Sequence, residues 1–186
     1  MDEKINIVIM AGGTGTRFWP YSRNKKPKQF LDILNTGRSL LQMTYDRFSN
    51  YVTKNQIWIV SNLIYAEIIS EQIPDLPPDH ILLEPSKRNT GPCIAYASYK
   101  IRKKDPNALL VITPSDHAIF KPESFLELIQ NAVDYAADSK KLLTIGIKPH
   151  RPETGYGYIQ YSPSNSIAKK VKTFIEKPDI DLAKKF

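Results

Sequence analysis

A glycine-rich segment near the N-terminus constrains this chain more than any other feature. Residues 10–23 read MAGGTGTRFWPYSR, and the apolar run Ile5–Met10 has the branched side chains of a strand buried in a parallel sheet. Gly12, Gly13 and Gly15 lack a Cβ atom, so the backbone N–H groups of this segment can turn toward a ligand. The sequence therefore predicts a ligand-binding loop that leaves the edge of a sheet.

Positive charge accompanies the glycines. Five basic residues follow them before position 29, namely Arg17, Arg23, Lys25, Lys26 and Lys28. Glycine backbone combined with fixed positive charge favours a polyphosphate ligand. A tight turn with solvated basic side chains is the simpler alternative. It is the weaker one here because both the charge and the glycines are concentrated in one loop.

Two common phosphate-binding loops are excluded. A Walker loop requires Gly-x-x-x-x-Gly-Lys-Ser/Thr, but no lysine occurs between Lys4 and Lys25. A dinucleotide fingerprint requires Gly-x-Gly-x-x-Gly, and Phe18 occupies the position of its third glycine. The loop is therefore of another type.

Apolar periodicity predicts alternating strands and helices along the rest of the chain. Further strands are expected at 56–60, 80–84, 108–112, 142–147, 158–161 and 170–175. Helices are expected at 38–48 with Ser39 as cap, at 63–73, from the cap Thr90 to 103 with Gly91 and Pro92 in the first turn, at 123–137, and from Asp179 onward. Residues 148–157 should form a loop, and the last two strands should pair antiparallel or in a mixed sheet.

This order of elements predicts a three-layer α/β/α domain with a mostly parallel mixed sheet. The 186 residues, 41% of them hydrophobic, suffice for one domain of ordinary size. The net charge of +7 fits either a nucleic-acid partner or an enzyme that handles phosphates. Because no basic stripe interleaved with aromatic residues occurs, we expect no nucleic-acid partner, and a non-catalytic basic binding module is the weakest alternative.

Compartment can be argued from cysteine usage and hydropathy. Cys93 is the single cysteine, which excludes an intrachain disulfide, favours the cytoplasm and predicts a small buried residue. No apolar stretch approaches the roughly 20 residues that span a bilayer, and residues 1–10 lack the pattern of a signal peptide. We therefore expect no membrane association.

The opening segment resembles a known family. The run from Gly12 to Arg17 with Pro27 and Lys28 is similar to the signature of sugar-1-phosphate nucleotidyltransferases. More narrowly, residues 18–23, FWPYSR, and 27–30, PKQF, resemble mannose-1-phosphate guanylyltransferases. The resemblance covers nearly the whole chain and implies a Rossmann-like nucleotidyltransferase fold.

The resemblance also implies substrates and residue roles. GTP and mannose 1-phosphate would give GDP-mannose and pyrophosphate, with Mg²⁺ as cofactor and room for a homodimer. Arg17 and Lys28 would be catalytic by stabilising the triphosphate and the leaving pyrophosphate. The nucleotide-binding loop would consist of Ala11, Gly12, Gly13, Thr14, Gly15 and Thr16.

Asp116 is the candidate metal ligand. It follows the strand predicted at 108–112, at the end of the sheet where ligands bind in open α/β folds. A carboxylate there needs a partner, and Mg²⁺ shared with nucleotide phosphates would supply one. Taken alone, Asp116 is better explained as the cap of a turn. The resemblance to the metal-binding aspartate of the family reverses that preference.

Two further groups complete the predicted site. The resemblance places Glu84, Asn89 and Thr90 beside the nucleotide base, where a carboxylate or amide can pair with the donor edge of guanine. It assigns Gly157, Glu176 and Lys177 to the sugar phosphate. Gly157 would allow close approach of the sugar ring, Glu176 would accept hydrogen bonds from the sugar hydroxyls, and Lys177 would hold the phosphate. Without it, Glu84 and Thr90 would be a strand-end acid and a helix cap, and residues 176–177 a surface ion pair.

The predicted domain covers residues 1–186. The resemblance implies that it is truncated on its C-terminal side, because the chain is shorter than the catalytic domain of the family and lacks the family's later sugar segment and second metal-binding aspartate after Lys177. We expect the isolated chain to keep the nucleotide half of the site and to be impaired in transfer. The main alternative is a related enzyme that uses another nucleotide or hexose phosphate.

Overall fold

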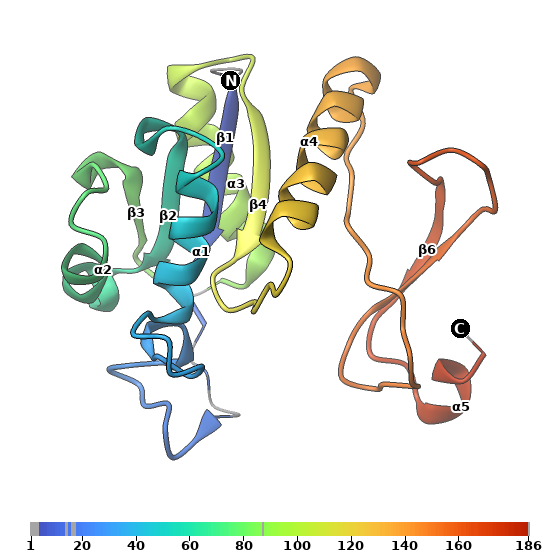
Figure 1. Ribbon diagram of the computed structural model, residues 1–186, viewed down its shortest axis with the longest axis horizontal. Coiled ribbons are helices and arrows are strands. Elements are labelled where there is room, and N and C mark those ends of the chain that lie inside the picture. Colours follow the sequence, from blue (N-terminus) through green and yellow to red (C-terminus); the bar gives the residue numbers. More distant parts are fainter. Residues whose placement is uncertain (1–3, 14, 16–17, 87, 186) are drawn as a thin grey trace. The chain divides into compact units, whose positions relative to one another are not determined.

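A computed structural model describes residues 4–13, 15, 18–86 and 88–185. The chain divides into two compact units, Met1–Val133 and Asp134–Phe186 (Figure 1). The first unit contains the glycine-rich loop and the predicted base and metal residues. The second contains the residues predicted to bind the sugar.

The first unit is built on a four-stranded parallel sheet with the strand order β3-β2-β1-β4. Its strands are β1 (Ile5–Met10), β2 (Ile57–Asn62), β3 (Ile81–Glu84) and β4 (Leu109–Pro114). All four agree with the predicted strands to within two residues at either end. Because the strands are parallel, their carboxyl ends lie at one edge of the sheet, and the glycine-rich loop leaves β1 at that edge.

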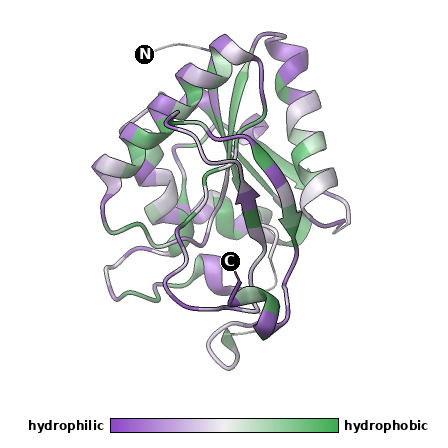
Figure 2. Ribbon diagram, turned by 90° about the vertical axis from the view of Figure 1, so that its right-hand side faces the viewer, coloured by the Kyte–Doolittle hydropathy of each residue, from purple (hydrophilic) through white to green (hydrophobic). Residues whose placement is uncertain are grey.

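Helices cover both faces of this sheet (Figure 1). One face packs against α1 (Leu40–Ser49), α2 (Ala66–Gln72) and the first part of α4 (Pro122–Ser139), and the other against α3 (Thr90–Lys104). A hydrophobic core lies on each face of the sheet, and alternate residues of β1 pack into one or the other. Ile7 packs with the first group of helices, and Val8 packs with α3. Figure 2 shows hydrophobic strands between helices that carry both hydrophilic and hydrophobic residues. The predicted three-layer α/β/α fold is confirmed.

Within the described ranges, short 3₁₀ helices connect these elements: η2 (Lys28–Phe30), η3 (Lys54–Gln56), η4 (Leu63–Tyr65) and η5 (Pro78–His80). The helix predicted at 63–73 thus begins as a 3₁₀ turn, with Asn62 accepting a hydrogen bond from the N–H of Ile64. It continues as α2 and ends before Pro74, as predicted. No described helix is both long enough and apolar enough to cross a membrane.

The predicted cap of α1 is confirmed. Ser39 accepts a hydrogen bond from the N–H of Gln42, and the side chain of Gln42 accepts one from the N–H of Ser39. This reciprocal pair is a capping box, which satisfies two donors that the first turn of a helix leaves without partners.

The predicted cap of α3 is wrong. Asn89 occupies the cap position, and Thr90 is the first helical residue. Pro92 lies in the first turn, as predicted, and its missing N–H costs no hydrogen bond there because the first N–H groups of a helix have no intrahelical acceptor. Thr90 can therefore be helical itself, and the cap falls on the preceding residue.

The second unit contains an antiparallel pair, β5 (Tyr158–Tyr161) and β6 (Val171–Ile175), followed by α5 (Ile180–Ala183). The antiparallel pairing was one of the two predicted arrangements, and the pair forms a sheet of its own. Asp179 caps α5 by accepting a hydrogen bond from the N–H of Leu182. The helix predicted to begin at Asp179 is thereby confirmed.

The strand predicted at 142–147 is wrong. Residues 140–149 carry no regular secondary structure, and the exposed fractions of Leu142 and Ile147 are 102% and 88%. Apolar alternation describes only side chains, whereas a strand also needs a neighbour that bonds its N–H and C=O groups. No described residue supplies that ladder to this segment.

Candidate active site

The loop after β1 lies beside the end of β3. A Cβ atom added to Gly12 would be 3.7 Å from Oε2 of Glu84. Ala11, at the start of the loop, is buried, and its N–H donates to the carbonyl oxygen of Val60 at 2.8 Å. The glycine-rich loop and the predicted base-reading carboxylate therefore share one edge of the sheet.

The backbone at Gly15 requires glycine. Its φ is +62°, and a Cβ atom there would be 2.5 Å from Oγ of Ser22 and 2.9 Å from the backbone N of Lys28. A Cβ atom at Gly13 would meet nothing within 4 Å. The loop thus folds back onto the turn that carries Lys28. The predicted site residues Thr14, Thr16 and Arg17 lie outside the described residues.

Lys28 and Asp116 form an ion pair between Nζ and Oδ2. Lys28 begins η2, and Asp116 follows β4, so the pair joins two segments far apart in the sequence. Their side chains are 30% and 22% exposed. The carboxylate is partly removed from water, and the ammonium group pairs with its charge there. Two residues predicted separately, one as catalytic and one as metal ligand, are thus brought together.

Helix α1 supports the turn that carries Asp116. Thr44 Oγ1 and Arg47 Nη2 donate to the carbonyl oxygens of Ser115 and His117, both at 3.4 Å. The N–H of Ser115 donates to the carbonyl oxygen of Met10 at 3.1 Å. Burial lowers the pKa of the Arg47 guanidinium from its ordinary value. No sequence pattern indicated this support, because the donors are 71 and 70 positions away from their acceptors.

Glu84 has a buried thiol as its neighbour. Burial raises the pKa of Glu84, and a hydrogen bond from the Cys93 side chain lowers it in part. Burial and the Glu84 carboxylate raise the pKa of the Cys93 thiol to about 11. The thiol therefore stays protonated at neutral pH and acts as a donor to Glu84 rather than as a nucleophile. The prediction that Cys93 is buried is confirmed.

Asn89 and Thr90 follow the same strand as Glu84 and are both exposed. Asn89 has φ +66° and ψ −170°, a backbone conformation that is strained for any residue except glycine, and its side chain makes no capping hydrogen bond. The role of these two residues toward a base stays a prediction.

The second unit gathers the three residues predicted to bind the sugar. The pairing of Tyr158 with Ile175 brings Gly157 next to Glu176, whose Oε2 would be 3.0 Å from a Cβ atom at Gly157. Lys177 Nζ forms an ion pair with Glu176 Oε1, and Lys177 has φ +44°. A side chain at position 157 would therefore crowd the Glu176 carboxylate, and the exposed Glu176 side chain would have to shift.

The amide of Gln29 is a feature that the sequence did not identify. Gln29 is only 2% exposed, and its Nε2 donates to the carbonyl oxygens of Ala11 at 2.9 Å and Gly13 at 2.8 Å. The only available signal was its place in the PKQF segment that carries the family resemblance.

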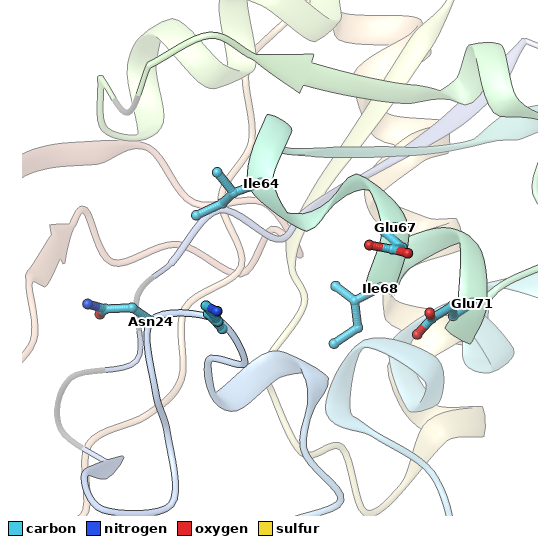
Figure 3. A pocket seen from close by; sticks show the side chains of 6 residues that line it. Asn24, Ile64, Glu67, Ile68 and Glu71 are labelled. Carbon is cyan, nitrogen blue, oxygen red and sulfur yellow. The ribbon is translucent and has the colours of Figure 1, made fainter.

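A hollow of about 470 Å³ lies elsewhere on the first unit (Figure 3). It is lined by Asn24, Lys25, Ile64, Glu67, Ile68 and Glu71. Glu67 and Glu71 both come from α2 and place two carboxylates there. The two carboxylates outnumber the one cation, Lys25, which disfavours a phosphate ligand, and no predicted site residue lines this hollow.

Comparison with known proteins identifies the family of this chain. The family model described as Nucleotidyl transferase matches residues 6–186. The mannose-1-phosphate guanylyltransferase of Escherichia coli is 39% identical over 195 residues, and that of Salmonella montevideo is 42% identical over 191 residues. They align with 100% and 98% of this chain but with only 41% and 40% of their own lengths. The chain therefore spans about two fifths of the length of these relatives.

A solved structure agrees with both the fold and the family. The structure described as mannose-1-phosphate geranyltransferase from Thermus thermophilus matches with a TM-score of 0.87 and 29% identity. The match covers 98% of this chain and 52% of that protein. The parallel sheet, the glycine-rich loop at its carboxyl edge and the match over residues 6–186 lead to one conclusion: the chain belongs to the nucleotidyl transferase family.

Proposed function

We propose that this chain carries substrate-binding residues of an enzyme that converts GTP and mannose 1-phosphate to GDP-mannose and pyrophosphate. The observation that carries the proposal is the edge of the sheet at which the glycine-rich loop, Glu84 and the Lys28–Asp116 pair lie. The names of the relatives that are 39% and 42% identical support the choice of substrates.

The proposed reaction needs no protein nucleophile. A phosphate oxygen of mannose 1-phosphate attacks the α-phosphorus of GTP, the bond from that phosphorus to the bridging oxygen breaks, and pyrophosphate leaves with the electron pair. The attacking oxygen is already anionic, so no general base is required. Catalysis then consists of positioning the phosphates and neutralising their charge.

The loop and two basic residues would carry that task on the nucleotide side. Backbone N–H groups of the glycine-rich loop would bind phosphate oxygens, as N–H groups do in other anion-binding loops. Lys28 and Arg17 would stabilise the charge that develops on the leaving pyrophosphate. On the sugar side, Lys177 would hold the phosphate and Glu176 would accept hydrogen bonds from the hydroxyl groups.

Asp116 fits the role of a magnesium ligand. The described residues contain no group of three or more His, Cys, Asp or Glu side chains arranged to hold a metal. Mg²⁺ needs no such cage, because in nucleotide enzymes it is typically bound by one or two carboxylates together with phosphates and water. When bound, the ion would neutralise phosphate charge. In the structure the carboxylate of Asp116 pairs with the ammonium group of Lys28, so a bound ion would share or replace that partner.

Glu84, Asn89 and Thr90 are the proposed selectors of guanine. The carboxylate of Glu84 can accept from the donor edge of that base, which adenine lacks. If they do not select guanine, the enzyme would be a related one that uses another nucleotide or hexose phosphate.

The wider setting of the enzyme is also proposed. The single cysteine supports a cytoplasmic location. Phosphate substrates are sufficient to explain the net charge of +7, so we propose no nucleic-acid partner. A homodimer stays a prediction, which the mass in solution would test.

A substrate panel tests the proposed function. The purified protein is supplied with each of GTP, ATP, UTP and CTP in combination with mannose 1-phosphate or glucose 1-phosphate, and pyrophosphate release is measured with Mg²⁺ present. We expect the highest kcat/KM for GTP with mannose 1-phosphate. A preference for another pair would replace the proposed substrates by those of a related enzyme. Salt-sensitive binding of nucleic acid without any turnover would support a binding module instead.

A further inference from the structure

We propose that Gln29 is a positioning residue that holds the glycine-rich loop in its phosphate-binding conformation. The inference rests on the proposed function and assigns to the loop a support that the family resemblance did not provide. Nε2 makes two hydrogen bonds of ordinary length, to the carbonyl oxygens of Ala11 and Gly13, and the side chain is almost completely buried.

These two bonds determine the orientation of the loop peptides. In a trans peptide the C=O and N–H groups point in opposite directions. Gln29 holds the carbonyl oxygen of Ala11 toward the interior, so the N–H of Gly12 in the same peptide points away from the interior. The carbonyl oxygen of Gly13 is held in the same way. Carbonyl oxygens would repel an anion, so their inward orientation leaves donors rather than acceptors for phosphate.

A second buried donor reinforces this orientation. Ser61 Oγ, at the end of β2, also donates to the Ala11 carbonyl oxygen at 2.9 Å. That oxygen thus uses both lone pairs within the protein. Of these two donors, Gln29 also binds the carbonyl oxygen of Gly13. Its amide nitrogen carries two protons and can donate twice, whereas the Ser61 hydroxyl carries one.

The turn that carries Gln29 is itself held by packing and a hydrogen bond. Phe30, the next residue, is 1% exposed and packs against the ring of Tyr65 with a centroid distance of 5.3 Å. Gln72 Nε2 donates to the carbonyl oxygen of Phe30 at 3.0 Å. Lys28 belongs to the same 3₁₀ turn as Gln29, so one anchored turn places both the loop and the lysine that pairs with Asp116.

The chemistry of glutamine suits this position better than that of its closest substitutes. Glutamate would present a carboxylate to two carbonyl oxygens, which repels the loop and buries a charge without a partner. Leucine or methionine would fill similar space without donating a proton. Each change leaves the Gly13 carbonyl oxygen without its Gln29 donor and frees the loop to turn that oxygen toward the ligand.

Binding of inorganic tripolyphosphate and of guanosine, each measured by calorimetry, tests the inference. Tripolyphosphate reports on the loop without the base, and guanosine reports on the base without the phosphates. For Gln29→Leu we expect the affinity for tripolyphosphate to fall by about tenfold or more and that for guanosine to stay within about twofold. If Gln29→Leu does not fold, Gln29→Met is measured in the same way, since methionine adapts to irregular space.

Gln56→Leu is the matched control. Gln56 is also a buried glutamine, and its Nε2 donates to a backbone carbonyl oxygen of β1, that of Ile5, at 2.8 Å. This bond lies at the other end of the strand. We expect Gln56→Leu to lower the free energy of unfolding while tripolyphosphate affinity stays within about twofold.

Several outcomes would overturn the inference. They are tripolyphosphate affinity unchanged in a folded Gln29 variant, equal losses for tripolyphosphate and guanosine, an equal loss in Gln56→Leu, and no tripolyphosphate binding by the unaltered protein. A protein whose tripolyphosphate binding depends on Gln29 but which prefers another nucleotide or sugar phosphate in the substrate panel would reject the proposed substrates and leave this inference intact.

Discussion

Among single residues, Gly15 offers the sharpest test of the loop conformation. Gly15→Ala would place a Cβ atom 2.9 Å from the backbone N of Lys28 at a φ of +62°. We expect a loss of about 1–3 kcal/mol in the free energy of unfolding, measured by denaturant titration, together with weaker GTP binding. Gly13→Ala is the control, because its Cβ atom would meet nothing within 4 Å. Equal losses in the free energy of unfolding of the two variants would contradict the crowding at Gly15.

Arg17 carries the largest predicted effect on turnover. A donor aimed at charge that develops in the transition state contributes about 2.7–4 kcal/mol, so Arg17→Ala should lower kcat by about a hundredfold or more. The measurement is the initial rate of pyrophosphate release at saturating substrates. Lys26→Ala, which removes an exposed charge nearby, serves as the comparison and should retain most of the rate. A near-normal rate in Arg17→Ala would reject its catalytic role.

The raised pKa of Cys93 has a measurable consequence. Raising the thiol pKa from 9.0 to about 11 reduces the thiolate fraction at pH 8 by about a hundredfold. We expect alkylation of the folded protein at pH 8 to be slower by at least that factor than in denaturant.

The same shift makes stability depend on pH. The folded state holds the Cys93 proton more tightly than the unfolded state, so the contribution is complete below pH 9 and is lost as the pH rises toward 11. Cys93→Ala should remove this part of the pH dependence. Equal alkylation rates in the folded and unfolded protein would show that the thiol is not protected.

Among the helices and strands, the capping box of α1 is the clearest case in which local sequence specifies a boundary. Ser39→Ala should lower the free energy of unfolding by about 1 kcal/mol or more, because the N–H of Gln42 loses its acceptor and Oε1 of Gln72 loses its donor. Thermal and denaturant unfolding would measure the change. Ser70→Ala is the matched control in α2, where Ser70 is exposed and its hydroxyl donates only to the Ala66 carbonyl oxygen. A loss as large in Ser70→Ala would mean that capping is not the cause.

Helix α1 also shows how one element performs two tasks. Its cap depends on neighbours in sequence, whereas Thr44 and Arg47 reach carbonyl oxygens on either side of Asp116. These two residues belong to the same helical face, since positions three apart lie above one another. The helix therefore links the core to the turn that carries the candidate metal ligand.

For the chain as a whole, the two compact units predict where a protease cuts first. Residues 140–157 are free of helix and strand in the structure and include the exposed trypsin sites Lys140 and Lys141. Lys148 and Arg151 are each followed by a proline, which blocks trypsin. Trypsin under native conditions should cut at Lys140 or Lys141 before it cuts at residues 102–104, which are equally basic but helical. Mass spectrometry of the first fragments would identify the sites. Earlier cleavage at 102–104 would contradict the difference in local structure.

The predictions that succeeded were those that depend on neighbours in sequence. The runs of branched residues identified the four parallel strands, and Ser39 and Asp179 marked two helix starts correctly. The strand expected at 142–147 failed because the apolar pattern carries no information on whether a hydrogen-bonding neighbour exists. The cap at Thr90 failed because Pro92 is tolerated at more than one position in the first turn.

Local sequence was sufficient to specify the loop, its charge and the family to which they belong, because glycine spacing, basic residues and apolar periodicity act between near neighbours. Which distant groups meet depends on the tertiary structure. Lys28 pairs with Asp116, Cys93 donates to Glu84, and the Gln29 amide binds the carbonyl oxygens of the glycine-rich loop. The parallel sheet brings these groups to one edge, and no local pattern encodes such a meeting, since it depends on strand order and on helix packing.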